Sequence, residues 1–222
     1  MPFSSRWPRS FLPILALAGC ASSGGTSPPP DQGMDVPSHA ADTGAMPDAG
    51  VFVDPRDSQS YPTITAGDNT WLARNLNYTI AGSSFCYDDV AANCDADGRL
   101  YLWDVAPTAC PPSSHLGSDD EWQALEAAMG MAPDQLDLEG YSTTRGTDEG
   151  TKLKAPEGFA ARMAGFRTGA TYDALGDRTY FWTSTMRGTE VWRRRIEAAT
   201  PTVFRFTNPP ATFAISIRCV LD

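Results

Sequence analysis

The sequence predicts an α+β fold in which helices come first and an antiparallel sheet comes last. Helical signals are concentrated between residues 118 and 136, whereas the alternation of apolar and polar residues that is typical of strands dominates after residue 178. Four cysteines between residues 61 and 222 could cross-link such a fold: Cys86, Cys94, Cys110 and Cys219. Residues 61–222 are enough for one domain with a full hydrophobic core.

The most clearly marked element is a helix that begins after Ser118. Ser118 and Glu121 have the spacing of a capping box, in which each side chain bonds the backbone of the other residue. Apolar residues follow at helical spacing, namely Trp122, Leu125 and Met129. Gly130 is a natural stop, and a second short helix is expected from Pro133.

The expected strands are short and most of them lie late in the chain. They cover residues 71–78, 98–103, 180–183, 191–196, 203–207 and 212–220. Within the second of these, Leu100 and Leu102 share one face, which is the period of two that defines a strand. Pro209-Pro210 separates the last two strands.

The first twenty residues resemble the signal peptide of a bacterial lipoprotein. Arg6 and Arg9 supply a positive n-region, and residues 11–18 form an apolar segment that is much shorter than the roughly 20 residues needed to span a bilayer. Leu17-Ala18-Gly19-Cys20 resembles the lipobox, in which cleavage precedes the cysteine and the thiol carries the lipid. We therefore expect a signal peptide over residues 1–19 and an anchor at Cys20. No aspartate follows Cys20, which favours an outer-membrane lipoprotein exposed to the periplasm or the cell surface.

Residues 20–60 are expected to form a disordered, acidic tether. They are rich in Pro, Gly, Ser and Ala, and they offer too few apolar side chains to offset the entropy lost on ordering. A flexible chain of this length spans about 35 Å, enough to hold a domain at residues 61–222 clear of the membrane.

An exported domain folds in an oxidising compartment, so its cysteines are expected to form disulfides. With Cys20 acylated, the other four cysteines allow three connectivities. We favour a local Cys86–Cys94 bond and a long-range Cys110–Cys219 bond, which by loop-closure entropy would stabilise the fold by about 2.5 and about 4.8 kcal/mol. A cytosolic metal site is the alternative, but no C-x-x-C pair is present.

The chain resembles the Fibrobacter succinogenes major paralogous domain. Matching blocks occur in order at residues 71–78 (W-L-A-R-N-L-N-Y), 86–88, 98–103, 110–111, 115–116, 118–122, 152–154, 158–161, 165–167, 182–185 and 218–220. The chain departs from the family pattern at Ser113-Ser114, where Gly-Trp is usual, at Gly117 in place of proline, and at Phe181 in place of tryptophan. The resemblance implies a C-type-lectin-like domain with two helices and an antiparallel sheet, whose long disulfide joins the first helix region to the final strand. It implies no particular activity.

Charge is unevenly distributed along the domain. Residues 61–150 carry fifteen acidic side chains against three arginines, whereas residues 151–222 carry eleven basic against six acidic side chains. One interpretation is that the two halves pack against each other with complementary charge. The other is an exposed basic patch, in which Trp192, Arg193, Arg194 and Arg195 contact an anionic ligand. Nucleic acid is not expected as a partner, because the chain is exported and has a net charge of −10.

One acidic segment has a spacing that suits calcium. Asn93, Asp95, Asp97 and Asp104 fall at positions 1, 3, 5 and 12 of an EF-hand loop, and Gly98 falls at position 6. An exposed acidic turn is the alternative, because position 12 is the shorter Asp and no flanking helix pair is evident. No other cofactor is expected.

Catalytic signals are weak. His115 is the only histidine of the domain, since His39 lies in the tether, and no G-x-S-x-G elbow accompanies it. We expect His115 to be structural and to bond backbone in a turn. The sequence therefore predicts no enzyme but a lipid-anchored binding or adhesion module, whose ligand is a glycan or another surface protein. A structural envelope component and a carbohydrate-active enzyme that uses two carboxylates are the alternatives.

Overall fold

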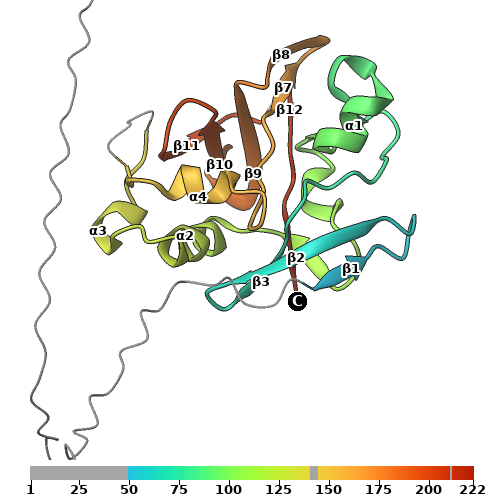
Figure 1. Ribbon diagram of the computed structural model, residues 1–222. Coiled ribbons are helices and arrows are strands. Elements are labelled where there is room, and N and C mark those ends of the chain that lie inside the picture. Colours follow the sequence, from blue (N-terminus) through green and yellow to red (C-terminus); the bar gives the residue numbers. More distant parts are fainter. Residues whose placement is uncertain (1–49, 141–144, 211) are drawn as a thin grey trace, which may run out of the picture. The chain divides into compact units, whose positions relative to one another are not determined.

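The computed structural model describes residues 50–140, 145–210 and 212–222, and it confirms the expected α+β class (Figure 1). The described part holds four α-helices, two sheets and two disulfides. The expected signal peptide, Cys20 and the tether up to residue 49 lie outside the described residues.

The helices are α1 (Ala91–Asp97), α2 (Asp119–Ala128), α3 (Pro133–Leu136) and α4 (Glu149–Lys154). The strands are β1 (Val51–Val53), β2 (Ser60–Ala66), β3 (Asn69–Leu72), β4 (Ser84–Phe85), β5 (Leu100–Leu102), β6 (Ser114–Leu116), β7 (Ala164–Thr168), β8 (Thr171–Leu175), β9 (Arg178–Arg187), β10 (Glu190–Glu197), β11 (Val203–Asn208), β12 (Phe213–Ile215) and β13 (Cys219–Leu221). The predicted capping box is confirmed at the start of α2, where the Glu121 backbone N–H donates to Ser118 Oγ and the Ser118 N–H donates to the Glu121 carboxylate at 2.7 Å.

A five-stranded sheet brings the two ends of the domain together. Its strand order is β1-β2-β3-β13-β6, and every neighbouring pair is antiparallel. Val220 of β13 pairs with Trp71 of β3, and Cys219 pairs with Leu116 of β6. The last strand therefore lies between strands from the first half of the domain.

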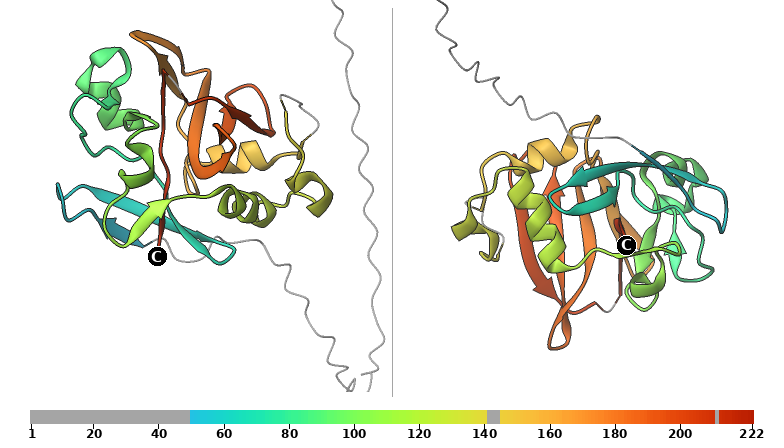
Figure 2. Two further views of the ribbon diagram at one scale, coloured as in Figure 1. Left: turned by 180° about the vertical axis from the view of Figure 1, so that it is seen from behind. Right: turned by 90° about the horizontal axis from the view of Figure 1, so that it is seen from below.

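The larger sheet carries the helices α2 and α4. Its order is β11-β10-β9-β7-β12-β5-β4, with β8 added beside β7, and among its named pairs only β7–β9 is parallel. One apolar cluster contains side chains from α2, α4 and β9–β11, so both helices pack on this part of the sheet (Figure 2).

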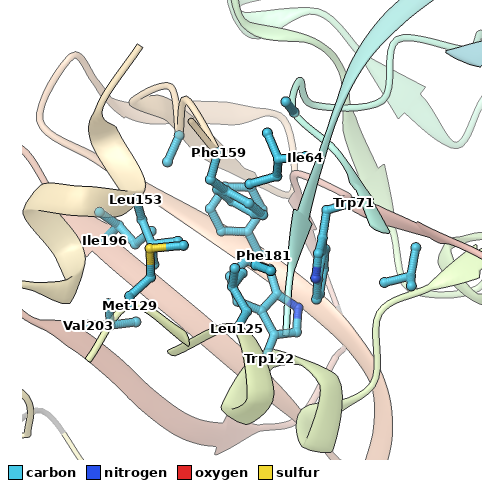
Figure 3. Packing of buried hydrophobic residues seen from close by; sticks show 14 residues of the cluster. Ile64, Trp71, Trp122, Leu125, Met129, Leu153, Phe159, Phe181, Ile196 and Val203 are labelled. Atoms are coloured by element: carbon cyan, nitrogen blue, oxygen red, sulfur yellow. The ribbon is translucent and has the colours of Figure 1, made fainter. Parts of the chain in front are cut away.

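The main core is a set of aromatic rings between α2, β3 and β9. Trp71, Trp122, Phe159 and Phe181 are fully buried. The ring centroids of Trp71 and Trp122 lie 5.1 Å apart, and those of Trp122 and Phe181 lie 5.2 Å apart (Figure 3). Phe181, where the family pattern has tryptophan, thus fills a core position rather than a surface position.

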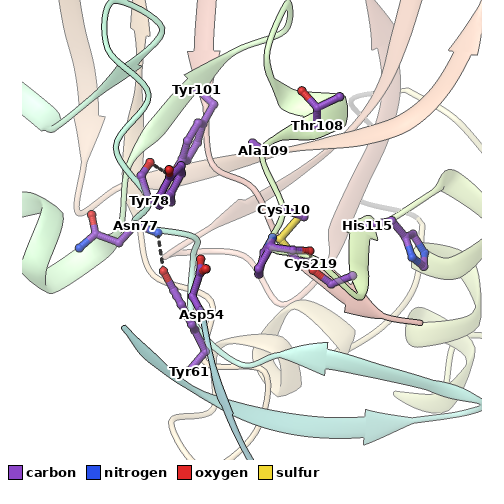
Figure 4. The surroundings of a disulfide bond; sticks show 12 residues. Asp54, Tyr61, Asn77, Tyr78, Tyr101, Thr108, Ala109, Cys110, His115 and Cys219 are labelled. Carbon is purple, nitrogen blue, oxygen red and sulfur yellow. Dashed lines mark hydrogen bonds between the residues drawn. A yellow bond between two sulfur atoms is a disulfide. The ribbon is translucent and has the colours of Figure 1, made fainter. Parts of the chain in front are cut away.

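Both favoured disulfides are confirmed. Cys86–Cys94 ties the end of β4 to α1, and Cys110–Cys219 joins residues 109 positions apart. Around the second bond, Tyr101 donates its hydroxyl proton to the Tyr78 carbonyl at 2.7 Å (Figure 4). Burial raises the pKa of Tyr101 well above its ordinary value, which keeps this donor protonated.

The expected end of the tether at residue 60 is wrong. β1 pairs with β2, and the intervening Asp54 is fully buried against Arg56, with 2.7 Å between Oδ2 and Nη2. Arg56 also donates to the Ala109 carbonyl and lies over the Tyr78 ring. An ion pair and a strand ladder thus order a segment whose composition indicated disorder.

Two further expectations are corrected. The structure has α1 and α4 in addition to the two predicted helices. The strand expected over residues 212–220 is divided between β12 and β13, which belong to different sheets. The chain crosses between the sheets at residues 216–218, where buried Arg218 donates to the backbone carbonyls of Leu72 and Phe159.

Candidate functional site

The four residues predicted to contact a ligand lie on β10 and are mostly buried, which contradicts their expected surface role. The exposed fraction is 8% for Trp192, 2% for Arg193 and 0% for Arg194, and the side chain of Arg195 is 12% exposed. Packing on both faces of β10 therefore covers them.

Arg194 belongs to a buried ionic network instead. Its guanidinium lies 2.6 Å from the Asp119 carboxylate and 2.7 Å from the Glu126 carboxylate, both on α2. Arg205 binds Asp119 at 2.6 Å, and Arg145 binds Glu126 at 2.5 Å. Three arginines and two carboxylates thus attach α2 to β10, β11 and the segment before α4.

The charges in this network stabilise each other. Burial alone would raise the pKa of Asp119, but hydrogen bonds from Arg205 and the charge of Arg194 lower it to about 2. Burial alone would lower the pKa of Arg194, but Glu126 and Asp119 raise it. Of the two interpretations of the charge asymmetry, complementary packing of the halves accounts for these side chains.

The other predicted contact residues take part in stacks within the fold. The Arg205 guanidinium lies 3.7 Å from the Trp192 ring centroid, and the Arg193 guanidinium lies 4.3 Å from that of Trp182. Arg195 lies over Phe204. The arginine and aromatic residues that suggested a sugar-binding surface are used for packing.

The predicted calcium loop is also contradicted, because its first half is helical. Asn93, Asp95 and Asp97 lie within α1, and the Asn93 amide donates to the Tyr87 carbonyl at 2.9 Å. Asp97 instead accepts from Arg162, while Asp104 lies at a separate cavity beside Trp103 and Pro210. A helix turns these oxygens in different directions, and no group of three potential metal ligands is found among the described side chains.

His115 lies on β6 between two carboxylates rather than bonding backbone as expected. Its Nδ1 is 2.6 Å from Asp222 and its Nε2 is 2.8 Å from Glu121. Burial alone would lower the pKa of His115, but these hydrogen bonds and charges raise it. Because both ring nitrogens are occupied, neither is placed to accept a proton from a serine hydroxyl.

The described surface has a groove that the sequence did not predict. Three adjoining cavities of about 270, 600 and 420 Å³ share the side chain of Arg162. Arg74 and Ala96 line the first two, and Lys154 lines the last two. We call these three cavities the α1 groove, because the C-terminal end of α1 forms one wall.

Cations are held along the α1 groove by specific contacts. Arg162, whose side chain is 60% exposed, lies 3.1 Å from the Asp97 carboxylate. Arg74 is exposed and donates to the Asp95 carbonyl at 3.1 Å. Lys154 donates to three backbone carbonyls at and after the end of β10, namely those of Glu197, Ala198 and Thr200. Burial lowers the pKa of Lys154, with the charge of Glu197 opposing the shift.

A further cation lies beneath the floor of the groove. Arg218 is fully buried and donates to the Asn75 side chain at 2.8 Å and to the carbonyls of Leu72, Phe159 and Ala160. Burial lowers the pKa of Arg218 to about 9, and the positive charge of Arg74 adds to the shift. Asn75 and Ala160 also line the groove, so this charge lies directly behind its wall.

The groove could not be predicted from the spacing of residues along the sequence, because its residues come from distant segments of the chain. Arg74 follows β3, Asp97 ends α1, Lys154 ends α4, and Arg162 precedes β7. Arg74, Lys154 and Arg218 do belong to the matching blocks of the family pattern, but nothing in those blocks indicates that they meet.

The chain matches the model of the Fibrobacter succinogenes major domain over residues 64–221, and it therefore belongs to that family. No curated protein and no solved structure matches it significantly. Within the described ranges, no helix has the length and apolar character required to cross a membrane.

Proposed function

We propose that this protein is a lipid-anchored, non-catalytic binding module of the bacterial cell envelope, and that the α1 groove is its ligand surface. The observation that carries the proposal is that three cavities share exposed Arg162 in their lining. A groove of this kind accommodates an extended ligand, such as a glycan or a segment of another surface protein.

The cell-envelope assignment rests on the N-terminal sequence and on the disulfides. Leu17-Ala18-Gly19-Cys20 has the form of a lipobox, and the residues after Cys20 favour the outer membrane. Two disulfides within one domain fit an oxidising compartment. If Cys20 carries the anchor, Cys20→Ala leaves a soluble or unprocessed precursor; continued partitioning of this variant with membranes would refute the anchor.

Within the α+β class, we propose more specifically that the domain has a C-type-lectin-like fold. It is supported by the Cys110–Cys219 bond, which ties the segment before α2 to the final strand. The pairing of Val220 with Trp71, which places the last strand against an early one, supports it as well.

The non-catalytic character is supported by the state of the side chains that could act on a substrate. Both nitrogens of His115 bond carboxylates. In the groove, the Asp97 carboxylate is bound by Arg162. A glycosidase requires two acids that flank the scissile bond.

The proposal is tested by a glycan array with the purified full chain in detergent, with calcium and with chelator. Saturable binding that is lost in Arg162→Ala and retained in Arg187→Ala is the expected result. Arg187 is a matched control, because its side chain is 49% exposed, pairs with Glu139, and lies outside the groove lining. Binding that both variants retain places the ligand elsewhere, and no binding favours the structural envelope role. Release of shortened glycans would support the enzyme alternative.

A further inference from the structure

We propose, on the basis of the proposed function, that the ligand of the α1 groove is a glycan that carries a carboxylate, with the carboxylate seated between Arg74 and Arg162. The ligand class is thus a uronic-acid polymer or oligosaccharide. The inference rests on the charges of the groove and on the polar groups that surround them.

The first observation is that three cations in or behind the lining of the groove have no carboxylate partner in the fold. Among the described residues, no carboxylate oxygen lies within ion-pair distance of Arg74, Lys154 or Arg218. Lys154 and Arg218 bond neutral oxygen atoms only. Elsewhere the fold neutralises buried cations with acids, as the contacts of Arg194 show.

The second observation is that two arginines of the groove, Arg74 and Arg162, retain donors for a ligand. Arg74 and Arg162 line the same two cavities, and both are exposed. Arg74 donates one hydrogen bond within the described part of the chain, to the Asp95 carbonyl, and Arg162 donates through its Nε to Asp97. A planar guanidinium has five N–H donors in a fork that matches a carboxylate, so both arginines retain donors for one. The buried charge of Arg218 behind the wall adds attraction without contacting the ligand.

The third observation separates a glycan from an acidic peptide. The cavity beside the two arginines is also lined by the acidic residues Asp95 and Asp97 and by the polar residues Gln59 and Ser60. Carboxylates accept hydrogen bonds from the hydroxyls of a sugar, whereas the ionised side chains of an acidic peptide are acceptors only and offer them no donor. A glycan with one negative group and several hydroxyl donors in each sugar residue fits both the two arginines and the acidic and polar residues of the lining.

The test compares two oligosaccharide probes, one with free carboxylates and one in which each carboxylate is an uncharged methyl ester. The purified full chain in detergent is titrated by calorimetry with a galacturonate oligosaccharide and with its fully methyl-esterified form, which retains every ring hydroxyl. We expect the free acid to bind at least about tenfold more tightly, and this preference to shrink as salt screens the charges. Arg74→Gln and Arg162→Gln should each remove most of the preference, whereas Arg187→Gln should leave it unchanged.

The groove substitutions are at exposed side chains, so we expect both variants to remain folded. Their urea midpoints should lie close to that of the unsubstituted protein. Because two different variants are tested, a folding defect in one of them does not decide the result. Equal affinity for the acid and the ester would overturn the inference, as would absence of binding to either, or tighter binding of poly-glutamate than of the free-acid oligosaccharide. If the acid and the ester bind equally and Arg162→Gln abolishes the binding of both, the groove still binds a ligand. That outcome would reject the preference for an acidic sugar and leave the proposed binding function standing.

Discussion

Substitution of Glu126 by Gln tests whether the buried ionic network holds α2 on the sheet. Glu126 is fully buried, and each of its carboxylate oxygens binds a different arginine: Oε1 lies 2.7 Å from Arg194 Nε, and Oε2 lies 2.5 Å from Arg145 Nη2. Glutamine has nearly the same shape, so the change removes the negative charge and one acceptor without opening a cavity.

The cost can be worked out from these contacts. Hydrogen bonds to charged groups contribute about 1.5–3 kcal/mol each, and two of them are weakened. Arg194 keeps Asp119, but among the described residues Arg145 is left with the carbonyls of Val203 and Leu136. Breaking a buried ion pair by removing one partner typically costs about 3–5 kcal/mol. We expect the free energy of unfolding to fall by that amount.

The assay is urea denaturation at pH 7 with both disulfides intact, followed by tryptophan fluorescence. Glu139→Gln is the matched control, because it makes the same chemical change at a half-exposed pair with Arg187, where the loss should stay below about 1 kcal/mol. The double variant Glu126→Gln/Arg145→Met should recover part of the stability, since it removes the unpaired buried charge. If Glu126→Gln costs no more than Glu139→Gln, the network does not hold α2 and the reasoning is refuted.

Three further predictions concern the disulfides, His115 and Gly117. Cys110→Ala should reduce the unfolding free energy by about 4.8 kcal/mol and Cys94→Ala by about 2.5, because the bonds close loops of 109 and 8 residues; equal losses in urea titrations would contradict the loop-closure argument. The raised pKa of His115 means that its contribution to stability is fully present below its ordinary value of 6.5 and is lost as the pH rises through the folded-state value. His115→Gln should therefore lower the thermal midpoint more at pH 5.5 than at pH 9, and an equal effect at both pH values would count against this role. Gly117→Ala should cost about 1–3 kcal/mol, since a Cβ there would lie 2.6 Å from the buried ring of Trp71; an unchanged urea midpoint would show that the ring can move.

Local features of the sequence predicted the elements whose signals lie within a few residues. The capping box of Ser118 and Glu121 marks the start of α2, and the alternation around Leu100 marks β5. The segment of β1 escaped notice because its composition resembles that of a tether, and Pro62 obscures the alternation of β2. Both strands are ordered by each other and by the buried ion pair of Asp54 and Arg56, which are contacts that composition cannot reveal.

The candidate site was the least predictable part of the protein. The run from Trp192 to Arg195 has the residue types of a ligand surface, but exposure depends on what packs against a strand. Here the acids of α2, more than sixty residues earlier in the chain, draw Arg194 into the core. In the same way, the spacing of Asn93 and Asp97 suits a metal loop, but the segment is helical and its oxygens point apart.

By itself, the sequence determined the family, the α+β class, the favoured disulfide pairs and the start of α2, because each depends on motifs or on spacing along the chain. Only the tertiary structure decided which arginines are neutralised and which line a surface. Arg194 and Arg74 have the same side chain, but one meets two buried carboxylates and the other meets a backbone carbonyl at the edge of a groove. That difference arises because folding brings distant segments together, and charge acts over distances in space rather than along the chain.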